Sequence, residues 1–145
     1  MNNQVGMSTN EIINSLKNIS SFIGCFACND IPPIKHYPSS FIVNTDRNNQ
    51  PGTHWVAIYM TKKSCLYFDS FGEEVQENDI MFFLRKYYEK VTYSMVQLQD
   101  YNSVTCGQFC ISFIRFVKDK KSYAMFIDKF VRNNLSLNDN ILYSL

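Results

Sequence analysis

The sequence contains little charge and no long hydrophobic run. Charged residues make up 19% of the 145 residues and the formal net charge is +1, so no strong electrostatic field favours a nucleic acid or a membrane surface as the main partner. No apolar run approaches the roughly 18 residues that span a bilayer, and the first ten residues lack the apolar core of a signal peptide. We therefore expect a protein of the cytoplasm or nucleus that is neither secreted nor bound to a membrane.

Histidine is scarce, and the number of cysteines is odd. The two histidines are His36 and His54, and the five cysteines are expected to be free thiols in a reducing compartment. Cys25 and Cys28 form a Cys-x-x-Cys pattern, which can supply half of a zinc site or a redox pair. Zinc takes four ligands, however, and His36 is the only nearby third. We therefore interpret both cysteines as structural and expect no metal and no other cofactor.

Apolar and aromatic residues are plentiful, at 46% and 15% of the chain, and predict a compact domain. A chain of this length forms one domain with a substantial core, so we assign residues 1–145 to a single domain. Ser8 and Glu11 form a capping box at the start of the first expected helix. Periodicity predicts helices over residues 9–19 and from residues 78, 106 and 123, a short helical tail, and strands over 41–43, 54–60, 65–69 and 92–98. Residues 20–38, with three of the four prolines, are expected to be irregular.

This pattern predicts the α+β class, with a small, mostly antiparallel sheet packed against helices. The strands over 54–60 and 65–69 are expected to form an antiparallel hairpin with both faces mostly buried, because both are almost continuously apolar. In a hairpin, the start of one strand lies beside the end of the other. His54 begins the first strand and Asp69 ends the second, so we expect the imidazole and the carboxylate to lie within reach of each other.

Cys106 follows a polar loop and begins an apolar helical pattern, which places it at a helix N-terminus. The free N–H groups and the positive dipole end there favour a thiolate, the nucleophilic form of cysteine. His54 would take the thiol proton, with Asp69 orienting the imidazole. Gln99 and the backbone N–H of Cys106 would stabilise an oxyanion, and Gly107 would leave room for a substrate backbone. Taken singly, such residues are more often structural, so the prediction depends on their joint order.

Three motifs together resemble the adenovirus-type maturation protease (adenain) family, including adenain-like proteases of large DNA viruses and Maverick/Polinton elements. They are His-Trp at 54–55, Asp-Ser-Phe-Gly at 69–72, and Gln at 99, seven residues before Cys-Gly at 106–107. The resemblance covers about residues 8–118. It implies a papain-like cysteine protease fold with His54 as the base, Asp69 as its orienter, Gln99 as the oxyanion donor and Cys106 as the nucleophile.

The resemblance also implies what such an enzyme acts on and where. It implies a cysteine endopeptidase that matures viral precursor proteins, commonly cleaving after small residues such as glycine, in the virion and in the host nucleus or cytoplasm. We expect the protein to be a monomer. Trp55, Gly107 and Asn102 are assigned to substrate binding. Adenovirus enzymes bind a peptide activator through a cysteine that aligns near Lys90, where this chain has none. They also use DNA as a cofactor, so weak DNA contact through scattered basic residues is left open.

Two alternatives remain at this point. Asp69 stands where adenovirus enzymes carry Glu, and this resembles the proteases that remove SUMO and other ubiquitin-like modifiers. Those enzymes usually have Asp directly before the nucleophile and a Gln one residue closer, whereas here Thr105 precedes Cys106. A deconjugating protease is therefore the second hypothesis. A non-catalytic peptide-binding module is the third, and the intact set of four site residues argues against it.

Overall fold

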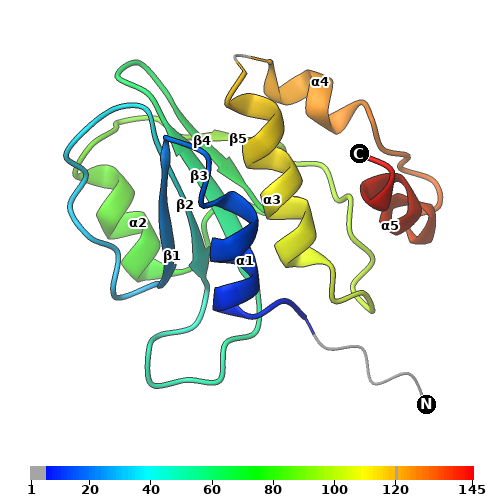
Figure 1. The fold of residues 1–145 in the computed structure, drawn as a ribbon, viewed down its shortest axis with the longest axis horizontal. Coiled ribbons are helices and arrows are strands. Elements are labelled where there is room, and N and C mark those ends of the chain that lie inside the picture. The colour runs from blue at the N-terminus through cyan, green and yellow to red at the C-terminus, as the bar shows by residue number, and fades with distance from the viewer. Residues whose placement is uncertain (1–5, 120) are drawn as a thin grey trace.

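The structure is a computed structural model that describes residues 6–119 and 121–145 (Figure 1). Along the chain, the elements are α1 (Thr9–Leu16), β1 (Phe22–Ala27), β2 (Ser39–Asn44), β3 (Trp55–Met60), β4 (Cys65–Phe68), α2 (Asn78–Arg85), β5 (Thr92–Tyr93), α3 (Cys106–Val117), α4 (Tyr123–Ile127) and α5 (Ser136–Tyr143). None of the helices in these two ranges is long and apolar enough to cross a bilayer.

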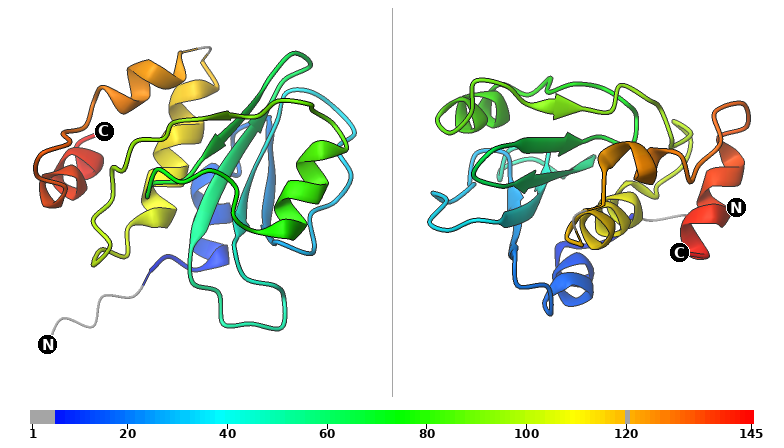
Figure 2. Two further views of the ribbon diagram at one scale, coloured as in Figure 1. Left: turned by 180° about the vertical axis from the view of Figure 1, so that it is seen from behind. Right: turned by 90° about the horizontal axis from the view of Figure 1, so that it is seen from above.

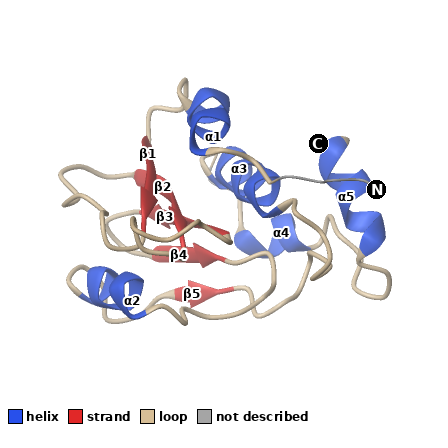
Figure 3. Cartoon of the chain, turned by 90° about the horizontal axis from the view of Figure 1, so that it is seen from below, coloured by secondary structure: helices blue, strands red, loops and turns tan. Residues whose placement is uncertain are grey.

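The five strands form one sheet in the order in which they occur in the chain (Figure 3). The inner pairings, β2 with β3 and β3 with β4, are antiparallel, as the sequence predicts. The outer pairings, β1 with β2 and β4 with β5, are parallel. The α+β class is therefore confirmed, but the sheet is mixed because two of its pairings are parallel.

Helices lie on both faces of this sheet (Figure 2), and each face packs into a hydrophobic core of its own. Alternate residues of β2 and β3, such as Ile42 and Ala57, pack with α1, α3 and α4. Their neighbours, such as Val43 and Ile58, pack with α2 on the opposite face. Strands buried on both faces need apolar side chains at almost every position, which explains the nearly continuous apolar runs of β2, β3 and β4.

Three elements differ from their predicted bounds. Residues 20–38 are not wholly irregular, because they contain β1, an edge strand whose residues are all half-buried and so show no alternation. The predicted strand over 92–98 shrinks to β5, since Met95 lies at φ 55°, outside the extended region. α1 has the expected capping box, with Ser8 Oγ accepting the Glu11 N–H at 3.2 Å, but ends at Leu16 rather than at residue 19.

Phe113 lies at the centre of the core beneath α3. Its side chain is fully buried and stacks on Phe68 with ring centroids 4.8 Å apart, and Phe126 meets it edge-on at 5.6 Å. We expect Phe113→Ala to lower the free energy of unfolding by about 3–5 kcal/mol, because it removes this buried surface and leaves a cavity. Urea denaturation would measure the loss. Phe82→Ala, at a side chain that is 69% exposed, is the control, and an equal loss in both variants would contradict the prediction.

Candidate active site

His54 and Asp69 meet at the end of the β3–β4 hairpin, as the sequence predicts. His54 directly precedes β3 and Asp69 directly follows β4. The Nε2 atom of His54 lies 2.8 Å from Oδ1 of Asp69, and the two side chains are only 13% and 7% exposed. Because Asp69 engages Nε2, the other ring nitrogen, Nδ1, is the atom left to exchange a proton with a thiol.

The turn after β4 fixes the Asp69 carboxylate. The Gly72 N–H donates to the Asp69 carbonyl at 2.8 Å, and the Phe71 N–H donates to Asp69 Oδ1 at 2.8 Å. Gly72 lies at φ 78°, and a Cβ atom there would approach the backbone of Val96 and Gln97 to 2.5 Å. Only glycine satisfies both conditions, so the Phe-Gly pair of the sequence motif has a structural role in holding the carboxylate.

Phe71 also supports the imidazole directly. Its ring stacks on His54 with centroids 4.5 Å apart and planes 16° from parallel. The Tyr101 ring packs in turn on Phe71, with ring centroids 4.9 Å apart. Neither ring was expected from the sequence to have a role. The residues following Asp69 in the motif were the only available signal, since an aromatic stack between a turn and a distant loop leaves no periodic pattern.

Cys106 is the first residue of α3, as expected, and is 7% exposed. Burial raises the pKa of its thiol, but the interaction with His54 and the backbone N–H groups of Trp55 and Gly107 outweigh burial and lower the pKa below its usual 9.0. Thr105 is the N-cap residue of α3, and its side chain makes no capping hydrogen bond to the helix. The first N–H groups of α3 are therefore available to negative charge on or near the sulfur.

The pKa of the His54 imidazole shifts in the opposite direction, upward. Burial lowers the pKa of His54, but hydrogen bonding to Asp69 and Cys106 and the negative charges of both raise it to about 9. A lowered thiol pKa beside a raised imidazole pKa favours a thiolate–imidazolium pair in the pH range between the two pKa values. This pair combines a nucleophile with a proton donor, which is the chemistry predicted from the sequence.

Gln99 is held by hydrogen bonds at both ends of its amide. Its Oε1 atom accepts from the Ser70 hydroxyl at 2.5 Å, and its Nε2 atom donates to the Ser103 carbonyl at 2.9 Å. An amide nitrogen carries two hydrogens, so one N–H remains for an oxyanion. The Ser70 carbonyl also accepts the N–H groups of Leu98 and Gln99 at 2.9 Å. Ser70 thus joins the half of the site that carries Asp69 to the half that carries Gln99.

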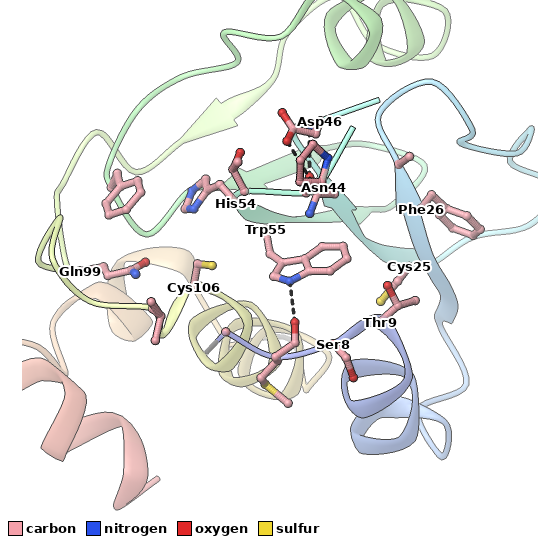
Figure 4. Close-up of a pocket in the computed structure, with 18 of the residues that line it drawn as sticks. Ser8, Thr9, Cys25, Phe26, Asn44, Asp46, His54, Trp55, Gln99 and Cys106 are labelled. Carbon is pink, nitrogen blue, oxygen red and sulfur yellow. Dashed lines mark hydrogen bonds between the residues drawn. The ribbon is translucent and has the colours of Figure 1, made fainter. Parts of the chain in front are cut away.

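His54, Gln99 and Cys106 line one end of a cleft of about 910 Å³ (Figure 4). Trp55 lines the cleft beside Cys106, and its indole N–H donates to the Met7 carbonyl at 3.2 Å. The N-terminal segment 6–9, the end of β1 and the loop 44–53 supply further walls. The sequence predicts residues 20–38 and the polar loop 44–53 as walls of a substrate slot, and both contribute to this lining. Only the segment 6–9 was not expected there, because a segment before a helix carries no distinctive pattern.

Two of the predicted substrate-binding positions lie elsewhere. Gly107 is buried, and a Cβ atom built on it would lie 3.1 Å from the Met7 side chain, so Met7 fills the space that we expected a substrate to use. Asn102 is exposed and is not part of the cleft lining. Its N–H donates to Asp100 Oδ1 at 3.0 Å, which gives it a role in the loop turn.

Cys25 and Cys28 lie in different environments. Cys25 lines the cleft, and burial raises its pKa to about 12. Cys28 lies near Glu77 and Asp79, whose ligand atoms and its own all fall within 4.8 Å of one another. Both carboxylates have protein partners, because Glu77 caps α2 at the Ile80 N–H and Asp79 pairs with Arg47 at 2.8 Å. Helix capping and an ion pair therefore account for this cluster.

Comparison with solved structures identifies the fold. A crystal structure of the ASFV pS273R protease matches with a TM-score of 0.62 at 20% sequence identity, over 97% of this chain and 66% of that one. A crystal structure of the selenomethionine form of the same protease matches with a TM-score of 0.55 at 21% identity, over the same shares. No family model and no curated protein sequence matches the chain. The chain spans about two thirds of the length of that viral protease and has the same α+β fold.

Proposed function

We propose that this protein is a cysteine peptidase with Cys106 as nucleophile and His54 as general base and acid. The observation that carries the proposal is the geometry at the cleft. A thiol with a lowered pKa begins a helix beside an imidazole whose Nε2 is bound to a buried carboxylate at 2.8 Å. The Gln99 amide, held by hydrogen bonds at both its oxygen and its nitrogen, completes the site.

Each side chain has a step in the proposed reaction. The Cys106 thiolate attacks the carbonyl carbon of the scissile peptide bond, and the backbone N–H of Cys106 and the free N–H of Gln99 stabilise the oxyanion. The C–N bond breaks as the His54 imidazolium gives its proton to the leaving amine, which leaves a thioester on Cys106. His54 then takes a proton from water, whose oxygen attacks the thioester, and the sulfur leaves as thiolate. Asp69 holds the imidazole throughout.

We propose viral precursor proteins as the substrates, cut during virion maturation in the infected cell or virion. The resemblance to adenain-type proteases, the position of Gln99 seven residues before Cys106 and the viral protease fold support this choice. Asp69, in place of Glu, specifically favours a second candidate, a protease that releases ubiquitin-like modifiers. Both candidates use the same chemistry and differ in what enters the cleft.

A cleavage assay separates the two candidates. Purified protein is incubated with co-encoded capsid precursors and glycine-containing peptides derived from them, with and without DNA, and in parallel with ubiquitin-like modifiers fused through their C-termini to a reporter. We expect cleavage of the viral precursors. Cleavage of the fusions alone would exclude the maturation function, and no cleavage of any substrate by folded protein would argue against the peptidase itself.

A further inference from the structure

The nucleophile helix α3 begins without a side-chain cap, although Thr105 at its N-cap is a residue type that normally caps. A Thr hydroxyl at this position usually accepts the N–H of the second or third helical residue, here Gly107 or Gln108. The Thr105 side chain makes no such bond, and its backbone, at φ −91° and ψ 13°, lies outside the extended region of a capping residue. Its hydroxyl donates instead to Oδ1 of Asp139, on α5, at 2.9 Å.

Asp139 also accepts a hydrogen bond from a second hydroxyl, that of Ser103. Ser103 donates to the second carboxylate oxygen, Oδ2, at 3.0 Å, and the Ser103 and Thr105 oxygens lie 2.7 Å apart. Thr105 is 5% exposed. A carboxylate only accepts hydrogen bonds, so both hydroxyl protons point toward α5. The Ser103 carbonyl, in turn, accepts from the Gln99 amide, which places Asp139 two hydrogen bonds from the proposed oxyanion donor.

The adjacent residue on α5 anchors this arrangement. Asn138 is fully buried, and its Nδ2 donates to the carbonyls of Leu98 and Val131 at 2.8 Å, while its Oδ1 accepts the Val131 N–H at 2.8 Å. All the polar groups of this amide are used. The position of Asp139 relative to the loop that leads into Cys106 is therefore set by buried bonds rather than by surface contacts.

We propose that Asp139 is a positioning residue for the nucleophile: by binding the Thr105 hydroxyl, it holds Thr105 in a conformation that does not cap α3 and so leaves the first N–H groups of the helix to Cys106 and to the oxyanion. The role that we assign to the oxyanion depends on the proposed peptidase function. The expected effect on the pKa of the Cys106 thiol does not depend on that function. It concerns only whether the Gly107 N–H donates to the Thr105 hydroxyl or faces the Cys106 sulfur. That N–H is one of the groups that lower the Cys106 pKa.

The alternative, a simple effect of charge, has the opposite sign. His54 is the ionisable group that shifts the pKa of the Cys106 thiol. Asp139 adds a negative charge from a neighbouring helix. Loss of that charge alone would lower the thiol pKa, because a nearby anion disfavours a thiolate. Release of Thr105 to cap α3 would raise it, because the thiolate would lose an N–H donor. The direction of the shift therefore distinguishes the two.

The test measures the rate of Cys106 alkylation by iodoacetamide against pH, with mass spectrometry to separate Cys106 from the other thiols. We expect Asp139→Ala to move the midpoint of the profile upward by about half to one pH unit, the size of one weakened hydrogen bond to a charged group. In Asp139→Ala/Thr105→Val no hydroxyl remains at the N-cap position of α3, so the midpoint should return to the wild-type value or just below it. Asp139→Asn removes the charge but leaves each hydroxyl a partner, since the amide oxygen accepts from one and the amide N–H donates to the other, so it should behave like the double variant.

A midpoint that is unchanged or lowered in Asp139→Ala would overturn the proposal. Thr105→Asn tests the same mechanism without altering Asp139, since asparagine is among the strongest N-cap residues and should also raise the midpoint, even if Asp139→Ala does not fold. With a cleaved substrate, we expect kcat of Asp139→Ala to fall about tenfold with KM little changed, as for a group that acts only in the transition state. If wild-type protein cleaves nothing, the alkylation profiles still decide the role of Asp139.

Discussion

Cys106→Ala should abolish peptide cleavage, with a fall in kcat of at least about 10⁴-fold, as when the nucleophile of a covalent mechanism is removed. The sulfur is the atom that forms the thioester, and nothing else at the helix start can replace it. The substrate cleft should persist, because alanine removes one atom from a side chain that is already 7% exposed. The measurement is kcat on a cleaved precursor, together with substrate binding to the inactive variant.

Cys65→Ala is the matched control for this prediction. Cys65 is 1% exposed in β4, and burial raises its pKa to about 12, so it is an inert thiol of the core. We expect the control variant to cleave substrate at the wild-type rate. If Cys106→Ala kept more than about a hundredth of wild-type activity, which exceeds what a site without its nucleophile retains, Cys106 would not be the nucleophile.

His54→Ala should slow the alkylation of Cys106 at pH 7 by about tenfold or more. In the wild-type protein the thiolate forms above the lowered pKa of Cys106, and the imidazolium persists until pH rises through about 9. Without His54, burial dominates and raises the thiol pKa, so the thiolate fraction at pH 7 falls. The greater intrinsic reactivity of a more basic thiolate offsets only part of this loss.

The pH dependence of alkylation distinguishes loss of the base from misfolding. The alkylation rate of His54→Ala should recover as pH rises, because hydroxide replaces the missing base, whereas a misfolded variant would not recover in this way. His36→Ala removes the other histidine, which is exposed, and should leave the profile unchanged. Identical profiles for His54→Ala and wild-type protein would show that His54 does not activate the thiol.

The parts of the site that the sequence predicted are those encoded by local pattern. The hairpin that brings His54 to Asp69 followed from two apolar runs separated by a short turn, and the helix start at Cys106 followed from apolar periodicity after a polar loop. Gln99 was assigned through the resemblance to adenain-type proteases, and the structure places it against Ser70 and Ser103, at the edge of the cleft. In each case the relevant residues are close in sequence or fixed by one strand pairing.

The parts that were missed depend on contacts between distant segments. Met7 lies beside Gly107 and Trp55 because of how α1 packs on the sheet and α3, and no periodicity near Met7 indicates this. β1 was missed because an edge strand with uniformly half-buried residues has neither alternation nor a continuous apolar run. Asp139 looked like an ordinary polar residue near the chain end, since its partners lie 34 and 36 positions away.

The fully buried Asn138 amide has a consequence for local unfolding. Because it bridges the Leu98 and Val131 carbonyls, α5 cannot detach without removing the amide donor from both, and Leu98 directly precedes Gln99. We therefore expect opening of the C-terminal helix and loosening of the segment that carries Gln99 to be one cooperative event, with a shared free energy. In hydrogen-exchange terms, the last helix of the chain and the proposed oxyanion donor belong to the same unit, although the donor lies far from that helix in the sequence.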